Sequence, residues 1–407
     1  MTEHSSVAAN GNASLDETPV TAASGTPETR YYANNSSLPG QGHNSGTVDD
    51  RRRSARFDRF RMRELGSWPR SKIPRCRKCG RVTHSDDGRV GVRRREGVAG
   101  FAGLVTCGSV WACSVCAAKI SARRAIEIGA AVGIAQDAGL GVGLVTLTMR
   151  HDRGQRLVDL WNAAGFAWSY RAVNGISWAK AREEVGFVGF WRVWEVTYGR
   201  NGWHVHVHAL VFAERLTAAS LGRLAVGLVE RWDRGLQAKG LDPIGWQGQD
   251  WRMVTAESWS SSSLGRYLAK SVEGIGREMS MSAGKSGRSE LSTSPVWTLL
   301  DDGLVWGDID SARLWWEWEK GSKGKRQMGV SHGLRERLGI GQEESDEDIA
   351  AETMGTEDDT VVWIEPLGWA RLISQPGWCA ELLEVVEHRA PELGDWLRAR
   401  GIAFSWA

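Results

Sequence analysis

The residues best suited to chemistry lie in the stretch 202–212, Gly-Trp-His-Val-His-Val-His-Ala-Leu-Val-Phe. It holds three of the nine histidines, His204, His206 and His208, with apolar residues between them. Because residues two apart share one face of a β-strand, a strand here presents three imidazoles side by side. Neutral imidazoles on one face suit a divalent ion such as Mn²⁺, Zn²⁺ or Ni²⁺. The alternative is an ordinary amphipathic strand with exposed or hydrogen-bonded histidines.

A carboxylate can join these histidines if the preceding segment pairs with them. Glu195 is the only carboxylate between Phe187 and Phe212. A hairpin centred on Arg200-Asn201, or on Asn201-Gly202, puts Glu195 directly opposite His206 or His208, with Cβ atoms ~5 Å apart. Two histidines and a carboxylate form a divalent-metal site with open positions. The alternative is a solvated Glu195 on an open sheet face.

Cysteines suggest a second metal site. The sequence has two C-x-x-C pairs, Cys76 with Cys79 and Cys113 with Cys116. Four thiolates from two such pairs suit a tetrahedral zinc ion, so these four are the favoured ligands. Cys107 is an alternative fifth ligand, or a reduced structural cysteine.

The tyrosines offer a nucleophile. Of only five in the chain, Tyr267 lies in Leu-Gly-Arg-Tyr-Leu-Ala-Lys, on a predicted helix. A tyrosine hydroxyl needs help from a metal or a positive charge to attack. Arg266 precedes it, and Lys270 lies nearly one helical turn away on the same face. Taken alone, a tyrosine on an amphipathic helix is more often part of a core.

The elements that must position these residues follow from hydrophobic periodicity. Strands are predicted over 141–149, 187–198, 204–212 and 251–255, and helices over 157–173 and 217–239. Thr217 is the expected N-cap of the second helix. A further helix follows residues 260–263. The order β-α-β-β-α-β plus a helix predicts an α+β fold with a ferredoxin-like antiparallel sheet and helices on one face.

Charge is distributed unevenly along the 407 residues, although the net charge is only +2. Residues 51–124 contain 20 Arg and Lys against 5 Asp and Glu, whereas residues 341–407 contain 4 against 15. The basic segment 51–124 favours binding of a polyanion, with nucleic acid as the leading candidate; the alternative is a basic surface that is only solvated. No apolar run reaches the ~18–20 residues of a membrane span. Without a signal peptide at the start, a cytoplasmic location with reduced thiols is expected.

Several of these motifs together resemble those of HUH endonucleases. The segment 206–211 fits their pattern of His, apolar residue, His and three apolar residues. Residues 267–270 resemble their tyrosine motif, and 144–148, Leu-Val-Thr-Leu-Thr, their first motif. The segments 107–120 and 194–204 resemble replication initiators of actinobacterial rolling-circle plasmids. The resemblance covers about residues 76–340.

The resemblance implies a mechanism. His206, His208 and Glu195 would hold Mg²⁺ or Mn²⁺ on a scissile phosphate of plasmid origin DNA, with His204 as an accessory. Tyr267 would attack, leaving a 5′-phosphotyrosine and a free 3′-OH, while Lys270 assists. Ser263 stands where related initiators have a terminating glutamate, so the terminating group is not assigned. A host helicase and a DNA polymerase are the implied partners; a relaxase, a transposase and a non-catalytic regulator are the alternatives.

Composition divides the chain into six regions. They are a disordered arm (1–50), a basic Cys-rich zinc and DNA-binding segment (51–135), an HUH endonuclease domain (136–290), a Trp-rich basic extension (291–340), an acidic linker (341–360) and a small helical region (361–407). Arg51, Arg52, Arg53 and Arg266 are the expected DNA contacts.

Overall fold

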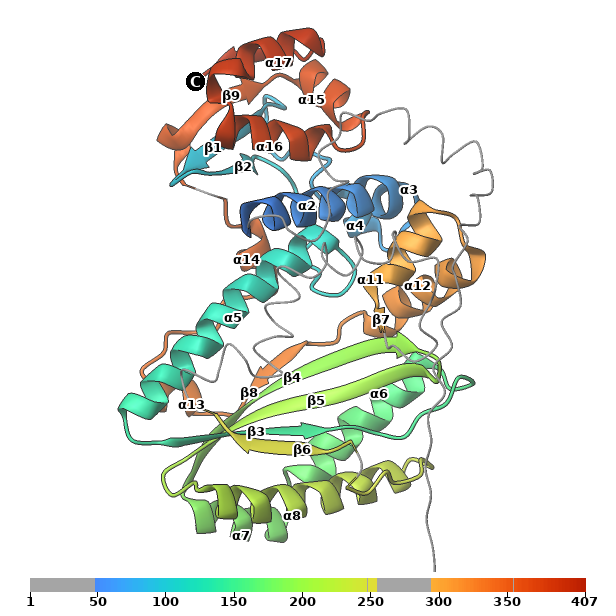
Figure 1. Cartoon of the computed structure of the whole chain (residues 1–407), viewed down its shortest axis with the longest axis vertical. Coiled ribbons are helices and arrows are strands. Elements are labelled where there is room, and N and C mark those ends of the chain that lie inside the picture. Colours follow the sequence, from blue (N-terminus) through green and yellow to red (C-terminus); the bar gives the residue numbers. More distant parts are fainter. Residues whose placement is uncertain (1–47, 247, 255–293, 354) are drawn as a thin grey trace, which may run out of the picture. The chain divides into compact units, whose positions relative to one another are not determined.

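Two antiparallel sheets organise the chain, one of six strands and one of four (Figure 1). They are seen in a computed structural model that describes residues 48–246, 248–254, 294–353 and 355–407. The α+β class is therefore as predicted. No helix in these residues is long and apolar enough to span a bilayer.

The larger sheet contains the four predicted strands. It is formed by β3 (Gly141–Leu147), β4 (Phe187–Gly199), β5 (Gly202–Ala213), β6 (Asp250–Met253), β7 (Ser294–Pro295) and β8 (Met328–Val330). The order is β6-β3-β5-β4-β7, with β8 also paired to β4. The predicted strands thus lie in the order fourth, first, third, second, and every neighbour is antiparallel.

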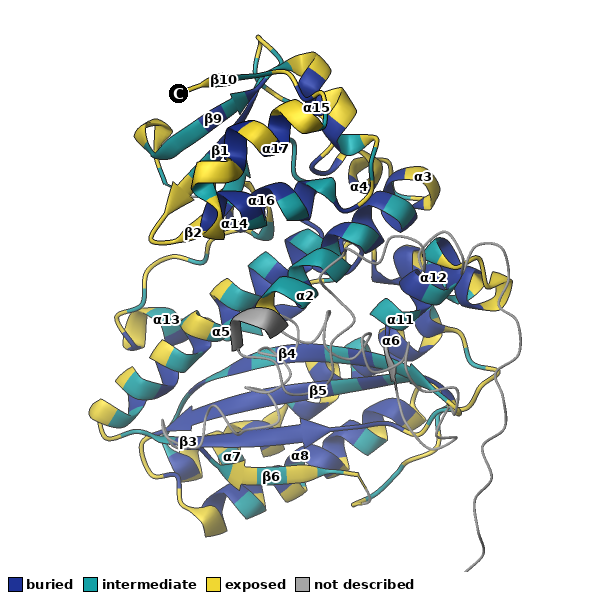
Figure 2. Ribbon diagram, turned by 45° about the horizontal axis from the view of Figure 1, so that its top comes forward, coloured by how far each residue is buried: buried dark blue, intermediate teal, exposed yellow. Residues whose placement is uncertain are grey.

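Helices cover both faces of this sheet, whereas the sequence predicted one. Odd-numbered side chains of β3 and β5 pack with α6 (Leu157–Phe166) and α8 (Ala218–Gln237). Even-numbered ones, such as Leu144 and Phe212, pack with Ile128 and Val132 of α5 (Ser114–Asp137). Figure 2 shows the ribbons of α5 and α8 on opposite sides of the sheet. The three histidines are even-numbered and therefore belong to the α5 face.

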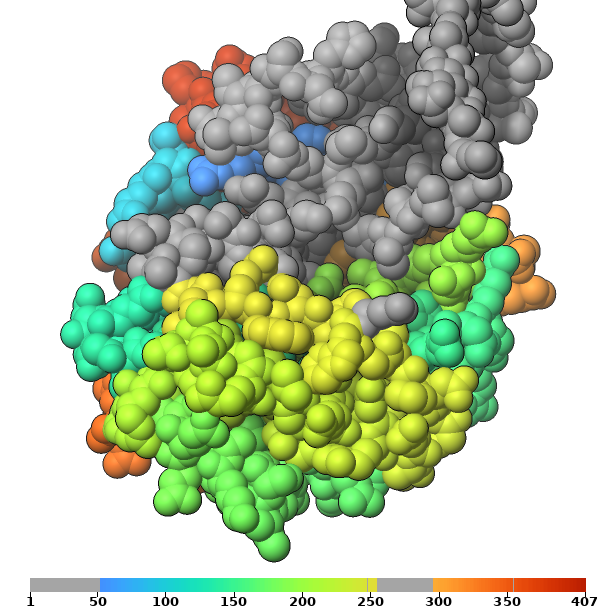
Figure 3. All heavy atoms as spheres, turned by 60° about the horizontal axis from the view of Figure 1, so that its bottom comes forward, coloured from blue at the N-terminus to red at the C-terminus, as the bar shows by residue number. Residues whose placement is uncertain are grey.

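The helix α8 forms where its cap and apolar spacing predict it. The Ser220 N–H donates to Thr217 Oγ1 at 3.2 Å, and the Thr217 N–H to Ser220 Oγ at 2.9 Å, which completes a capping box. Leu224 and Leu228 are among its buried residues. The segment that runs from α8 to β6 forms the yellow-green and yellow part of the face in Figure 3. The predicted helix 157–173 corresponds to α6 followed directly by a π-helix, η2 (Ala167–Ala172). The helix α7 (Ile176–Val185) was not predicted.

The smaller sheet joins segments far apart in the sequence. Its order is β10 (Phe404–Trp406), β9 (Thr360–Ile364), β1 (Val90–Arg95) and β2 (Val98–Ala102). Val92 of β1 pairs with Val362 of β9. The helices α15 (Pro366–Ile373), α16 (Trp378–His388) and α17 (Leu393–Ala399) share its core. Residues 361–407 are therefore not only helical, as expected, but supply strands to a sheet with the Cys-rich segment.

The remaining elements are helices outside the two sheets. They are α2 (Val48–Arg61), η1 (Met62–Ser67), α3 (Trp68–Arg70), α4 (Pro74–Lys78), α11 (Trp297–Leu300), η3 (Asp301–Val305), α12 (Ile309–Ser322), α13 (Leu334–Arg337), α14 (Asp346–Ala351), η4 (Glu357–Asp359) and η5 (Ala390–Glu392). The expected acidic linker contains α14, which packs on α5.

Candidate functional site

A two-residue turn fixes which histidine faces the carboxylate. Gly199 pairs with Gly202, which leaves Arg200-Asn201 as the turn and pairs Glu195 with His206. Gly202 has φ 86°, and a Cβ there would lie 2.9 Å from the backbone of Asp152. Only glycine suits both demands. Of the two predicted registers, the first is the one observed.

A hydrogen-bonded chain links the carboxylate, one histidine and the first strand. Glu195 Oε2 lies 2.7 Å from His208 Nε2, and His208 Nδ1 lies 3.0 Å from Thr146 Oγ1. Thr146 is directly opposite His208 in the pairing of β3 with β5. Since a threonine hydroxyl both donates and accepts, it can serve either tautomer of the ring. Thr146 therefore orients the imidazole, as outer-shell partners of metal ligands do.

The histidines continue in a row along the sheet. Ring centroids lie 6.1 Å apart for His206 and His208, and 3.8 Å apart for His204 and His206. His151 extends the row at 4.5 Å from His204, and its Nδ1 lies 2.9 Å from the Asn201 carbonyl oxygen. His151 was not predicted as a site residue. Its position two residues after the predicted strand 141–149 was the available signal.

The electrostatics favour the protonation states that metal ligands need. Burial lowers the pKa of His206 to about 4 and that of His204 to about 3. For Glu195, burial raises the pKa, but the hydrogen bond from His208 and the charges of the histidines outweigh it, so that the pKa is lowered. At neutral pH the site thus offers neutral imidazoles at His204 and His206 beside an ionised carboxylate.

The donor set fits a divalent ion in chemistry but is not closed around one. Within the described residues, ligand atoms all within 4.8 Å of one another occur at a cysteine cluster and at a group around Glu387, not at the histidine strand. Glu387 itself accepts two hydrogen bonds from Arg56 at 2.8 Å. At the histidine strand, His208 instead contacts Glu195 directly, so its Nε2 must turn from the carboxylate to an ion for both to act as ligands.

The predicted nucleophile is not part of this geometry. Tyr267, Lys270 and Arg266 lie outside the described residues. Of the predicted DNA contacts in α2, Arg52 is exposed, and Arg53 forms an ion pair with Glu384 at 3.2 Å. Arg51 belongs to α2, but its side chain is not among those described.

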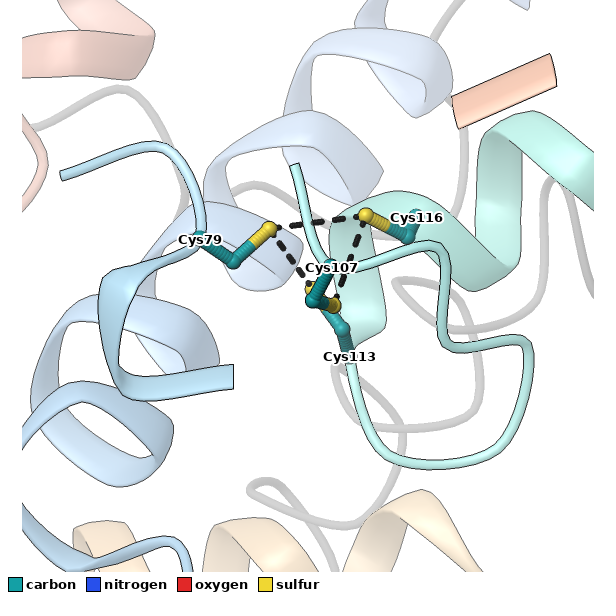
Figure 4. Close-up of side chains that lie close together, drawn as sticks. All are labelled: Cys79, Cys107, Cys113 and Cys116. Carbon is teal, nitrogen blue, oxygen red and sulfur yellow. Dashed lines mark hydrogen bonds between the residues drawn. The ribbon is translucent and has the colours of Figure 1, made fainter. Parts of the chain in front are cut away.

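Four buried cysteines converge near the start of α5 (Figure 4). Cys79 Sγ lies 3.4 Å from Cys116 Sγ and 3.6 Å from Cys113 Sγ, and Cys107 Sγ lies 3.7 Å from Cys116 Sγ. Zn–S bonds of about 2.3 Å in a tetrahedron place sulfurs about 3.8 Å apart. The cluster therefore fits a metal such as zinc. Cys79, Cys113 and Cys116 are common to the predicted and observed groups.

The fourth cysteine differs from the favoured prediction: it is Cys107, the alternative, rather than Cys76. Residues 80–84 pair with 103–105 through bonds such as Gly80 N–H to Val105 O at 2.7 Å and Val105 N–H to Val82 O at 2.8 Å. This pairing brings Cys107 beside Cys79. Cys76 lies one turn back in the short helix α4 and is buried outside the four.

Tryptophans attach the cysteine loop to the larger sheet. Trp111, between Cys107 and Cys113, meets Trp161 of α6 and Trp318 of α12 edge-on, with centroids 5.1 and 5.5 Å away. Trp318 Nε1 donates to the Trp111 carbonyl oxygen at 2.7 Å. The loop that carries two of the four cysteines is thus anchored in the core that supports the hairpin.

Comparisons with known proteins give two relatives. The chain is 27% identical to "Protein rep" of Streptomyces lividans over 334 residues, which are 66% of this chain and 72% of that protein. It is 33% identical to "Neomycin resistance protein" of Streptomyces cyanogenus over 161 residues, which are 34% of this chain and 37% of that protein. No family model matches, and neither does any solved structure.

Proposed function

We propose that the chain is a plasmid rolling-circle replication initiator, an HUH endonuclease with a ferredoxin-like sheet, which nicks one strand of the origin and later rejoins it. The observation that carries this proposal is the hairpin register, which puts Glu195 opposite His206 and in hydrogen-bond contact with His208. The similarity to "Protein rep" over 66% of the chain supports a Rep-type plasmid protein. The name of the second relative is not carried over, because only 37% of that protein is matched.

In this proposal each residue has one role. His206, His208 and Glu195 hold Mg²⁺ or Mn²⁺, which would polarise the scissile phosphate. The Tyr267 oxygen attacks phosphorus, and the bond from phosphorus to the 3′ oxygen breaks. The downstream strand is then joined to Tyr267 through its 5′ phosphate, and the upstream strand ends in a 3′-OH. Lys270 and Arg266 offset the charge of the phosphate. His204 stands beside the ligands.

The other predicted residues act in binding. Cys79, Cys107, Cys113 and Cys116 hold a structural zinc ion, and the basic segment with Arg51, Arg52 and Arg53 contacts DNA phosphates. The substrate is the single-stranded or hairpin region of a plasmid origin. A host helicase and a DNA polymerase would then use the nicked strand.

Covalent capture tests the reaction. Oligonucleotides that tile both strands of the replicon carrying the gene are labelled at the 5′ or the 3′ end and incubated with protein and Mn²⁺. The 3′ label should become attached to the protein, and the released 5′-labelled fragment should be extended by a polymerase. Tyr267→Phe should abolish both signals, whereas Tyr170→Phe, at a tyrosine that is 67% exposed, should retain them.

The alternatives give different results. A non-catalytic DNA-binding regulator binds the oligonucleotides but gives no adduct with either label. A relaxase or transposase gives the adduct but does not support replication of a plasmid that carries only the nicked region. Attachment of the 5′ label instead of the 3′ label would contradict the proposed polarity.

A further inference from the structure

An acidic segment of the chain lies against basic residues from three other segments. We call residues 343–348, with the sequence Glu-Glu-Ser-Asp-Glu-Asp, the acidic strap. The basic surface beneath it consists of Arg75, Arg123, Arg124, Lys323, Lys325 and Arg326. Arg75 comes from α4, Arg123 and Arg124 from α5, and the other three from the loop after α12.

Carboxylates of the strap pair with arginines of the surface one after another. Glu343 accepts hydrogen bonds from Arg326 at 2.9 Å through both oxygens. Glu344 lies 3.1 Å from Arg123. Two further pairs are Glu347 with Arg75 at 3.2 Å and Asp346 with Arg124 at 3.3 Å. Four of the five carboxylates of the strap are thus engaged by arginine.

These pairs contribute little to folding, since most are exposed. The side chains of Arg75, Arg123 and Arg326 are 53%, 50% and 72% exposed. An exposed ion pair stabilises a fold by about 0–1 kcal/mol. An incoming anion can therefore replace the carboxylates at small cost. The guanidinium fork binds phosphate as well as carboxylate.

The basic surface keeps its shape independently of the strap. Trp111 Nε1 donates to the Lys325 carbonyl oxygen at 2.7 Å, which fixes the basic loop to the cysteine loop. Lys325 Nζ also donates to Asn162 Oδ1 at 2.8 Å. Basic side chains, backbone of the cysteine loop and the strap line one cavity of about 710 Å³. With the strap displaced, this cavity would open onto basic side chains, and the loop that carries Lys325 would stay anchored.

The strap remains tethered when it leaves. Its last three residues, 346–348, are the first three of α14, and the rest of that helix holds it, because Ile349 is buried and the Ala350 carbonyl oxygen accepts from Lys119 Nζ at 3.2 Å. A tethered competitor acts at a high effective concentration, so it can limit binding although each of its contacts is weak.

We propose that the basic surface binds the phosphate backbone of DNA and that the acidic strap occupies it in competition with DNA. The strap then weakens the binding of non-specific DNA. Only DNA that other parts of the protein bind at the same time can displace the strap from the basic surface. This inference rests on the proposed function for the identity of the polyanion. It does not depend on cleavage.

Neutralising the strap tests the competition. The variant Glu343→Gln, Glu344→Gln, Glu347→Gln is made with Tyr267→Phe, so that binding is measured without reaction. Fluorescence anisotropy with a duplex of arbitrary sequence should show an affinity about tenfold higher than with the strap intact. The dependence on salt should be steeper by about 0.9 in the log–log slope for each additional phosphate contact.

A charge-matched control separates the strap from net charge. Glu230→Gln, Glu357→Gln, Asp358→Asn removes the same three charges at exposed positions elsewhere. It should change the affinity much less. An equal gain in both triple variants, or no gain with the strap variant, would overturn the proposal.

A second set of variants tests the surface itself. Arg75→Gln, Arg123→Gln, Arg326→Gln, added to the neutralised strap, should abolish the gain, whereas Arg223→Gln, Arg313→Gln, Arg398→Gln should retain it. Arg124 is left in place because it is 3% exposed. If the gain in DNA affinity persists in the variant with Arg75→Gln, Arg123→Gln and Arg326→Gln, DNA binds elsewhere and the proposal fails. If no covalent adduct forms in the cleavage assay but these affinities behave as expected, only the proposed function fails.

Discussion

The cysteine cluster and the histidine strand differ in how far their ligands must move to hold an ion. In the cluster, the sulfur–sulfur distances are 3.4–3.7 Å, close to the ~3.8 Å of a tetrahedral zinc–thiolate site. At the histidine strand, His208 is hydrogen-bonded to Glu195, and the ligand atoms are not all within 4.8 Å of one another. The cysteines can bind an ion almost where they lie, whereas His208 has to move away from Glu195 before both can bind one.

The difference corresponds to two uses of a metal. A structural zinc site has four protein ligands and contributes its binding free energy to folding. A catalytic site keeps positions for water and substrate, and is built on a scaffold that folds without the ion. We infer that an ion at the cysteines stabilises the fold, whereas the β-hairpin already supplies the scaffold for the histidines. Four predictions test this contrast.

The largest effect is expected at the fourth cysteine. Cys107→Ser should reduce bound zinc to well below one ion per chain and lower the unfolding free energy by on the order of 5 kcal/mol, because a structural ion contributes directly to folding. Cys76→Ser should retain the zinc. Metal content and thermal unfolding of the two purified variants provide the measurement. Zinc retained in Cys107→Ser but lost in Cys76→Ser would restore the original ligand assignment.

Loss of a histidine-strand ligand should separate activity from stability. Glu195→Gln and His208→Ala should reduce cleavage by more than about 100-fold, since even outer-shell partners affect activity 10–100-fold. Thermal midpoints should change far less than in Cys107→Ser, most clearly for the isosteric Glu195→Gln. His204→Ala, on the same strand, is the matched control and should retain most activity. Unfolding of Glu195→Gln would mean that the carboxylate is structural.

The part of this contrast that sequence could predict is the local part. The register of Glu195 with His206 follows from the Arg200-Asn201 turn, and the cap at Thr217 from its own side chain. Both depend on residues a few positions apart. The spacing of residues was enough to predict the cap and to narrow the register to two alternatives, of which the structure has the first.

Long-range pairing accounts for most of what sequence missed. Val92 pairs with Val362 across some 270 residues, and nothing in either segment identifies the other. Cys107 joins Cys79 only through the pairing of 80–84 with 103–105. An acidic run such as 343–347 looks the same in sequence whether its side chains are solvated or paired with arginines, so the sequence predicted a linker here. Tyr267 lies outside the described residues and stays a prediction.

A smaller effect is expected where the strand supports the ligand. Thr146→Val removes the hydroxyl 3.0 Å from His208 Nδ1 and should reduce Mn²⁺ affinity or cleavage by about 10–100-fold. Thr146→Ser retains the hydroxyl and should recover most of the loss. The two can be compared by titrating Mn²⁺ in the cleavage assay. Equal defects in both would indicate that packing of the threonine methyl, not orientation of the ring, is what matters.

The smallest effect concerns the pH dependence of stability. The contribution of Asp58 to it must be known before the stabilities of variants at the two metal sites are compared at different pH values. Burial raises the pKa of Asp58, in α2, to about 6, against the opposing charge of Arg61. The folded protein then binds this proton more tightly than the unfolded chain, so the stabilisation is complete below about pH 4 and is lost as pH rises through about 6. Asp58→Asn should remove that decline and raise the unfolding free energy at pH 7 by on the order of 1 kcal/mol. Thermal midpoints of the variant and wild type, measured with zinc between about pH 5 and 8, should diverge with rising pH. Asp310→Asn, at an exposed position, should follow the wild type. Parallel curves for Asp58→Asn and wild type would show that Asp58 does not cause the pH dependence of stability.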